Sequence, residues 1–489
     1  MSALMALLSA LIIAGPGWAD VETLPGPVVH PYSLELLANS RYSVHSGFTD
    51  SLPEQVLANV LWAMNRVPRL GEFRQFYVAN RGGVYAYEPA GNVLTLHKSG
   101  DYRYSSTAAF EVGIACDRHE EAGMAIQAGL LAGVAFAESA GPGVASCPMK
   151  WATDNANSDW EPDHPIMMVN VYGQADVEKL DSTLAAFSSD TSLPAPQVCG
   201  TDSFELVLMG LEQDSVFSSV PLSLPALSQL LWAGYGTTPH VAYNGRRGLT
   251  VPSAVASYFL TGHIYVVLDD GVHRFRNRPP SGNMNLADHR LEDFLVGDRR
   301  FELRQASNRI PATAPAYIVV CVEDTGSYGP MQEAGFAAFQ YLAQAHAMRL
   351  GGCVTACFDR TESQQIASAL GLPPGDIPVV VFSVGEVATG ISEQKAPGVV
   401  EVVQARPVLR PGEELRVEYL LRQTGTVRAE VYDMLGRPVC KLLDARQPAG
   451  YHSLTWDGTD AEGQRVKIGS YVVSIFSQGS VGQHKVAVF

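Results

Sequence analysis

The order of apolar and polar positions in residues 32–388 occurs twice along the chain. Each occurrence begins with a helical pattern that contains Leu-Trp-Ala and continues through strand-like segments around Val84 and Val272. An apolar strand rich in β-formers follows, AAFEVGIAC in the first and AYIVVCV in the second. A long apolar helix and a last strand, Ile166–Val171 or Ile377–Ser383, complete each occurrence. The pattern predicts two α+β units in tandem.

The two long helices are expected over residues 121–138 and 331–350. Both are apolar nearly all round, which is typical of a helix buried on every side. Gln340, Gln344 and His346 argue against a membrane-spanning second helix, and Gly351-Gly352 predicts its C-terminal stop. We therefore expect both helices to be buried where the two units meet. His119-Glu120-Glu121 is interpreted as a helix start, with acidic residues at the N-terminal end.

Five pairs of matching segments indicate that the two units are copies of one sequence. Matches in one fixed order are not expected by chance and indicate a duplication. We assign the copies to residues 20–200 and 201–397. The matching pairs are Tyr32–Leu37 with Asp202–Val207, Ser51–Ala63 with Ser223–Ala233, Gly83–Tyr87 with Gly271–Phe275, Glu121–Ala125 with Glu333–Ala337, and Pro162–Gly173 with Pro374–Gly385.

The residues before the repeat have the character of a signal peptide. Met1–Ala19 combines an apolar stretch, Ala3–Ala14, with the small residues Gly17 and Ala19, although no positive n-region precedes the stretch. The stretch is too short to span a bilayer as a helix but suits a signal-peptide core. A buried N-terminal helix is the alternative, and the loop-like residues that follow argue against it. We expect residues 1–19 to be a signal peptide and the protein to be secreted, at the cell surface or in the periplasm.

Residues 398–489 have a different pattern, with short alternating strands and regularly spaced turns. Strands are expected at Leu415–Leu421, Val427–Tyr432, Val466–Ile468 and Tyr471–Ser477, as in a β-sandwich. The series Val431–Gly436, Trp456–Gly463 and Gly469–Val473 resembles the immunoglobulin-like domain of flagellar hook-capping proteins and of type IX secretion sorting tails. The resemblance implies an address or adhesive module that contacts secretion or cell-surface machinery.

Composition excludes several classes of function. The net charge is −16 and no basic stripe occurs, which argues against a nucleic-acid partner. Seven cysteines, an odd number without a small-domain framework, do not form a disulfide scaffold, although one bridge stays open as an alternative. Cys353 and Cys357 have no second pair of ligands, so we expect no metal site.

Three segments of the second copy carry a family resemblance: Leu227–Ala233, Pro252-Ser253, and Glu333-Ala-Gly335 with Gln340. In this order they resemble the nitroreductase superfamily, nearest its azoline-dehydrogenase branch. The resemblance implies an α+β fold that works as a dimer, with FMN at the interface taking contacts from both subunits. A tandem duplication would supply that dimer inside one chain, so we expect a monomer with an internal pseudo-dimer.

The flavin motifs of the family are unevenly kept in the two copies. Copy one has Arg41-Tyr-Ser43-Val-His45, which we align with Gln213-Asp-Ser215-Val-Phe217 in copy two. Copy two instead has Arg246 and Arg247 followed by Pro252 and Ser253, in a stretch that copy one lacks. A flavin phosphate needs cationic donors, and the ring needs an apolar slot. The resemblance therefore implies one composite flavin site, with Arg41, Ser43 and His45 from copy one and Arg246, Arg247, Pro252 and Ser253 from copy two.

The leading hypothesis is an exported FMN-dependent oxidoreductase that passes hydride from the flavin to a small organic substrate. The sequence identifies no catalytic acid or base. NAD(P)H is not expected outside the cytoplasm, and an oxidase that uses O2, as in the azoline branch, avoids this difficulty. The alternative is a non-catalytic secreted binding or structural protein on a degenerate, flavin-free scaffold.

Overall fold

The computed structural model describes most of the chain from Asp20 to Val488. The described residues form two compact units, divided between Ala388 and Thr389. The predicted signal peptide, His45 and Cys357 lie outside them. The described ranges are 20–44, 46–49, 52–140, 143–176, 180–187, 193–242, 244–279, 281–311, 313–356, 358–388, 400–405, 408–409, 414–433, 437–467, 469–478 and 480–488.

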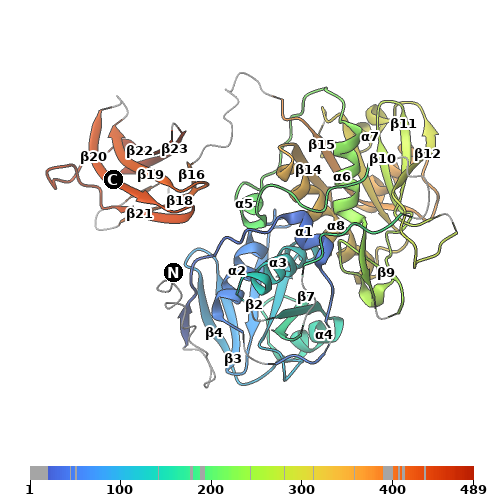
Figure 1. Cartoon of the computed structure of the whole chain (residues 1–489), viewed down its shortest axis with the longest axis horizontal. Helices are drawn as coiled ribbons and strands as arrows, with labels where there is room; N and C mark the ends of the chain where they lie inside the picture. Colours follow the sequence, from blue (N-terminus) through green and yellow to red (C-terminus); the bar gives the residue numbers. More distant parts are fainter. Residues whose placement is uncertain are drawn as a thin grey trace. The chain divides into compact units, whose positions relative to one another are not determined.

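Copy one is a seven-stranded antiparallel sheet between helices (Figure 1). Helices α2 and α3 pack on one face of the sheet with Phe76 and Val78, and α4 packs on the other with Tyr77 and Ala79. In sheet order the strands are β1 (Val21–Thr23), β4 (Val93–Ser99), β3 (Gly83–Glu88), β2 (Arg74–Ala79), β5 (Phe110–Cys116), β7 (Ile166–Gln174) and β6 (Val144–Pro148). The helices are α1 (Leu34–Ser40), α2 (Glu54–Arg66), α3 (His119–Ala140) and α4 (Lys150–Asp159).

Copy two repeats this plan in a six-stranded antiparallel sheet. Its sheet order is β12 (Arg290–Val296), β11 (Gly271–Arg276), β10 (Ile264–Val267), β13 (Ala316–Val322), β15 (Ile377–Gly385) and β14 (Gly351–Ala356). Its helices are α5 (Phe204–Met209), α6 (Leu224–Tyr235), α7 (Arg300–Ala306), α8 (Tyr328–Ala347) and α9 (Arg360–Leu370). Between α6 and β10 it adds the short hairpin β8 (Thr237–Val241) and β9 (Arg247–Leu249), and the turn η1 (Ala254–Ala256).

Matching irregularities confirm the duplication. The pairing of β3 with β4 shifts register between Val84 and Tyr85, and the equivalent pairing in copy two shifts between Val272 and His273. The sheet centre behaves alike, with shifts at Ile114/Ala115 and at Val320/Cys321. β-Bulges are kept within families of related proteins, so bulges at equivalent positions of the two sheets indicate that both derive from one ancestral sheet. The predicted stop at Gly351-Gly352 is wrong, because α8 ends at Ala347 and the two glycines begin β14.

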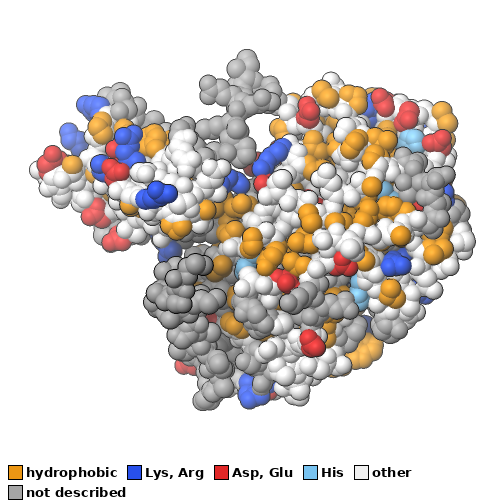
Figure 2. All heavy atoms as spheres, in the orientation of Figure 1, with side chains coloured by type: hydrophobic (Ala, Val, Ile, Leu, Met, Phe, Trp, Pro, Cys, Tyr) orange, Lys and Arg blue, Asp and Glu red, His pale blue; other side chains and the backbone are white. Residues whose placement is uncertain are grey.

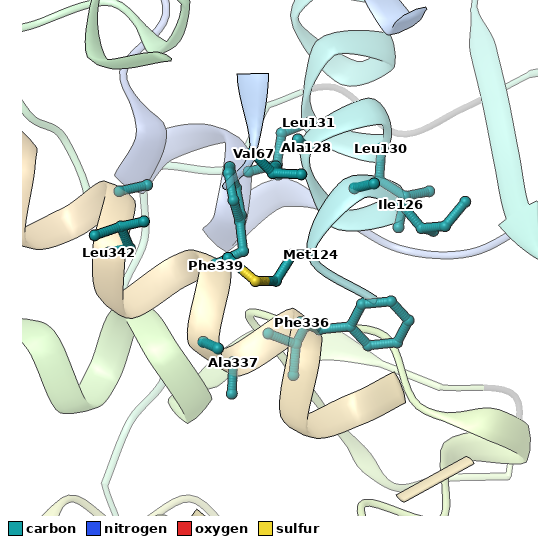
Figure 3. Packing of buried hydrophobic residues seen from close by; sticks show 14 of the residues in the cluster. Val67, Met124, Ile126, Ala128, Leu130, Leu131, Phe336, Ala337, Phe339 and Leu342 are labelled. Atoms are coloured by element: carbon teal, nitrogen blue, oxygen red, sulfur yellow. The ribbon is translucent and has the colours of Figure 1, made fainter. Parts of the chain in front are cut away.

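The two copies meet along α3 and α8, as the apolar pattern predicts. Figure 3 shows Met124 of α3 beside Phe336 and Phe339 of α8. Two glycines at equivalent repeat positions let the backbones touch: a Cβ on Gly123 would lie 2.2 Å from the Gln332 carbonyl oxygen, and one on Gly335 would lie 2.1 Å from that of Glu120. By length and composition α3 passes for a membrane span, but 78% of its most apolar window is buried within the protein.

The C-terminal unit is a β-sandwich with a separate apolar core that includes Val431, Trp456 and Val473. One sheet has the order β16 (Val400–Ala405), β18 (Leu415–Leu421), β21 (Gly450–Trp456). The other has the order β17 (Val408–Leu409), β23 (Ser480–Val488), β22 (Gly469–Ser477), β19 (Gly425–Asp433), β20 (Pro438–Gln447). The predicted strand at Val466–Ile468 is wrong: Val466 and Lys467 are not in a strand, and Ile468 lies outside the described residues.

Candidate functional site

A cavity of about 880 Å³ is lined by residues of both copies. Copy one supplies the segment after α1, including Arg41 and Ser43, and the junction of β6 with α4. Copy two supplies the loop between β9 and β10 and the start of α8. Pro252 and Ser253 lie on that loop and line the same cavity. Four of the predicted site residues, two from each copy, are therefore brought together.

Arg41 is a buried cation in the wall of this cavity. Its side chain is only 5% exposed, and its guanidinium donates to the Leu249 carbonyl (3.1 Å) and to the Ser43 hydroxyl (3.5 Å). Its Nε has no hydrogen-bond partner and no carboxylate pairs with it among the described residues. Burial lowers the pKa of Arg41 to about 10, so the side chain stays charged at neutral pH. A buried cation without a counter-charge is costly, and an anion in the cavity would offset that cost.

Further arginines surround the same loop. Arg41, Arg278 and Arg246 all stabilise the ionised form of Tyr258, although burial outweighs them and raises the pKa of the phenol. Arg278 is 2% exposed, and its guanidinium carbon lies 5.3 Å from the centre of the Tyr258 ring. Burial lowers the pKa of Arg278 to about 10. Of these arginines only Arg41 lines the cavity, whereas all three act on Tyr258, which also lines it; their positive charge favours a negatively charged ligand.

Two predicted phosphate ligands have other partners. Arg246 donates to the Ala256 carbonyl at 2.8 Å, and Arg247 donates to the Pro239 carbonyl at 2.9 Å. Neither side chain is among the cavity-lining residues. Contact of Arg246 and Arg247 with a ligand therefore stays a prediction, although each already donates to a backbone carbonyl of the loop or the hairpin. His45 lies outside the described residues.

The cavity loop has an unusual backbone. Val255, Ala256 and Tyr258 have φ angles of +48°, +52° and +57°, in the left-handed region that L-residues seldom adopt. The β-branched Val255 is the least favourable of these. The Ser253 hydroxyl accepts the Tyr258 N–H at 2.7 Å, and Arg246 holds the Ala256 carbonyl, so polar contacts maintain the loop. Strain of this kind gathers at ligand-binding sites.

The sequence alone did not identify several cavity residues. His119 begins α3 and lines the cavity; its Nδ1 is buried without a partner among the described residues, and its ring lies 4.5 Å from that of Tyr328. Burial lowers the pKa of His119. Tyr42 of copy one stacks on His240 of copy two at 5.0 Å. Contacts that join the copies depend on the fold, so spacing along the chain carries no signal for them.

Strand pairing also corrects the alignment of the two phosphate segments. In each copy, one residue of the last strand pairs on one side with the first residue of the central strand. On its other side it pairs with Ser146 in copy one and with Gly352 in copy two, so these two residues are equivalent. Their carbonyls accept the N–H groups of Val44 and Asp214 at 3.2 and 2.9 Å. Asp214 is thus equivalent to Val44, which puts Leu211 rather than Gln213 at the place of Arg41. Copy two still offers no cation there.

Comparison with known proteins assigns the domains. Residues 216–386 match the model of the Nitroreductase family, and residues 406–480 match that of the FlgD Ig-like domain. No curated protein matches the chain. A structure described as a nitroreductase, from Anabaena variabilis, covers 76% of this chain and 94% of its own length, with 11% identity and a TM-score of 0.50.

Two further solved structures align with smaller parts of the chain. One from Ralstonia eutropha, also described as a nitroreductase, covers 44% of this chain and 98% of its own, with 21% identity and a TM-score of 0.33. An FMN-dependent nitroreductase from Clostridium difficile covers 37% and 86%, with 16% identity and a TM-score of 0.26. The fold is a pair of α+β units like that of the Anabaena variabilis structure. Within the chain, residues 216–386 are similar to the Nitroreductase family and residues 406–480 to the FlgD Ig-like domain.

Proposed function

We propose that this protein is an FMN-dependent oxidoreductase with one composite flavin site per chain, in the cavity between the copies. The observation that supports this most is the buried, uncompensated guanidinium of Arg41. A phosphate is the kind of ligand that would satisfy both its charge and its unpaired Nε, because Arg binds phosphate through several parallel donors.

The rest of the cavity suits the remainder of the cofactor. Its volume of about 880 Å³ lies in the range of small-molecule sites. Apolar and aromatic side chains, Met167, Pro252, Phe259 and Phe336 among them, offer a slot for a planar ring. Arg41 and Ser43 would hold the phosphate, while Ser253 and the loop backbone would orient the ring. When bound, FMN supplies the capacity to accept and release hydride.

The family match supports the same class of chemistry, since residues 216–386 match the Nitroreductase family. We further propose that the substrate is a small organic molecule, and that one chain acts as a monomer because it carries both halves of the site. We also propose export to the cell surface, the periplasm or the medium, which the expected signal peptide and the similarity to an Ig-like domain support. That domain would contact secretion or surface machinery.

The direct test is flavin binding by the purified protein. FMN should bind, and Arg41→Ala should weaken it by about tenfold or more, because a charge-assisted contact contributes roughly 1.5–3 kcal/mol. Riboflavin, which has no phosphate, should be affected far less by the same substitution. Arg247→Ala is the matched control, since it removes a nearby charge that donates to Pro239 instead. Failure of the wild-type protein to bind FMN, or equal losses for FMN and riboflavin, would refute the proposal.

One observation favours a second candidate, a non-catalytic binding protein on the same scaffold. Arg246 and Arg247 donate to backbone carbonyls and do not line the cavity, so fewer cations than predicted are available for a phosphate. This candidate predicts a stable protein that neither retains nor binds flavin. The same binding experiment separates the two.

A further inference from the structure

One buried glutamate of the repeat has different charge and hydrogen-bond partners in the two copies. Glu121 of α3 and Glu333 of α8 occupy the same position of the repeat, as the matching Glu-Ala-Gly segments show. In copy one, Arg74 Nε lies 2.6 Å from Glu121 Oε1. The second oxygen of Glu121 accepts the N–H groups of Leu70 at 2.7 Å and Gly71 at 3.0 Å. Glu121 is therefore a fully compensated carboxylate.

Copy two has no such cation. Phe76 and Ile264 are equivalent because they pair with equivalent residues of the central strands. Gly262 lies two residues before Ile264, as Arg74 does before Phe76, so Gly262 occupies the position of Arg74. Glu333 Oε1 instead accepts the Tyr235 hydroxyl and, at 3.3 Å, the N–H of Leu260. Glu333 is fully buried, and no lysine, arginine or histidine pairs with it in the described part of the chain.

The groups that face Glu333 connect it to the cavity. Tyr235 comes from α6, and Ser253, Tyr258 and Leu260 come from the cavity loop. Burial raises the pKa of Glu333 to about 7, although the hydroxyl groups of Tyr235 and nearby Ser253 and the loop backbone lower it. A carboxyl group that exchanges its proton near neutral pH beside a ligand cavity is suited to acid–base work. Ser253 lines the cavity, and its hydroxyl lies near enough to lower the pKa of Glu333, whose Oε2 is buried without a hydrogen-bond partner among the described residues.

We propose that Glu333 holds a proton for this cavity and delivers it through the hydroxyl group of Ser253. The inference rests on the proposed function, because a neutral organic substrate that takes hydride from the reduced flavin becomes an anion and needs one proton. Ser253 donates its hydroxyl proton to that anion and takes the proton of Glu333. Glu333 is left as a carboxylate, which the Tyr235 hydroxyl stabilises until water returns the proton. Glu333 thus acts through Ser253 and does not itself touch the substrate.

Infrared titration of the flavin-free protein tests the proton-holding role. The difference between wild-type and Glu333→Gln spectra should contain a protonated carboxylic acid band at pH 6 that is lost as the pH passes about 7. The difference isolates Glu333 from Glu111, whose pKa burial also raises to about 7. Glu121→Gln is the matched control and should remove no such band. A Glu333 carboxyl that is already ionised at pH 6 overturns the proposal.

The second test uses the flavin-loaded protein and the pH profile of substrate reduction. In wild type the rate should fall above about pH 7 as the acid form is lost, and Glu333→Gln should remove this dependence and lower the rate at pH 6 by about tenfold or more. Glu333→Asp should restore part of it, and Ser253→Ala should slow the reaction while leaving the infrared band in place. An unchanged profile in Glu333→Gln overturns proton delivery. Absence of flavin binding would instead overturn the proposed function, while the infrared result would stand.

Discussion

The contact between the copies can be tested at a single atom, by adding a methyl group to Gly335. The new Cβ would lie 2.1 Å from the backbone oxygen of Glu120, and contacts to Cβ closer than 3.0 Å essentially do not occur. Backbone cannot rotate away as a side chain can, so α3 and α8 must separate by about 1 Å at their crossing. That movement would open gaps around Met124, Phe336 and Phe339, which pack beside it (Figure 3).

Two effects of opposite sign set the magnitude. Replacing glycine by alanine inside a helix stabilises it by up to about 1 kcal/mol. Overpacking a tight core contact costs about 1–3 kcal/mol, and more when backbone must move. We expect Gly335→Ala to lower the free energy of unfolding by about 1–2 kcal/mol, and Gly123→Ala to do the same from the other helix, where the oxygen of Gln332 is 2.2 Å away.

Gly133 is the matched control on α3. A Cβ there would meet Tyr172 and Val144 at 3.5 Å, an ordinary contact, so Gly133→Ala should be neutral or stabilising by up to about 1 kcal/mol. Urea unfolding followed by tryptophan fluorescence measures all three variants. If Gly335→Ala proves as stable as Gly133→Ala, the helices do not cross at these glycines and the account of the pseudo-dimer is wrong.

Three further outcomes are expected. The pKa of Glu333 is about 7 in the folded protein and 4.5 ordinarily, so between these pH values only the folded state holds its proton. The free energy of unfolding should therefore fall by about 3 kcal/mol as the pH rises through this window. A pH series in which Glu333→Gln keeps the full slope would contradict this. Arg74→Met should destabilise the protein by about 3–5 kcal/mol, because it leaves the Glu121 carboxylate buried and unpaired, and a melting temperature close to wild type would argue against a buried ion pair. Deleting residues 398–489 should leave the remaining unit folded but change where the protein resides, whereas a truncated chain without a cooperative thermal transition would show that the two units depend on each other.

Apolar periodicity predicted the large features of the fold because it reports burial directly. The all-round apolar character of α3 and α8 identified the helices at the contact, and the repeated segments identified two copies. The hairpin β8–β9 and the helices α4 and α9 were missed, since their short or polar segments resemble loops. The face of the molecule in Figure 2 shows no large basic cluster, in keeping with the net charge of −16.

The site was predictable only where the family resemblance supplied the pairing of motifs. Arg41 and Ser253 are 212 positions apart in the sequence, and no local pattern relates them. The burial of Arg41, the strained backbone from Val255 to Tyr258 and the missing counter-cation of Glu333 arise from tertiary packing. Arg246 illustrates the same limit, because its position next to the ligand motif did not reveal that its side chain donates to the Ala256 carbonyl and does not line the cavity.

The stoichiometry of flavin binding tests the central claim most directly. Isothermal titration of the flavin-free protein with FMN should give one site per chain, because Arg41 has only Leu211 as its counterpart in copy two and the Pro252-Ser253 loop has none in copy one. Binding of two FMN molecules per chain would show that both interfaces are complete. No binding at all would leave the pseudo-dimer as a scaffold and contradict the flavin site.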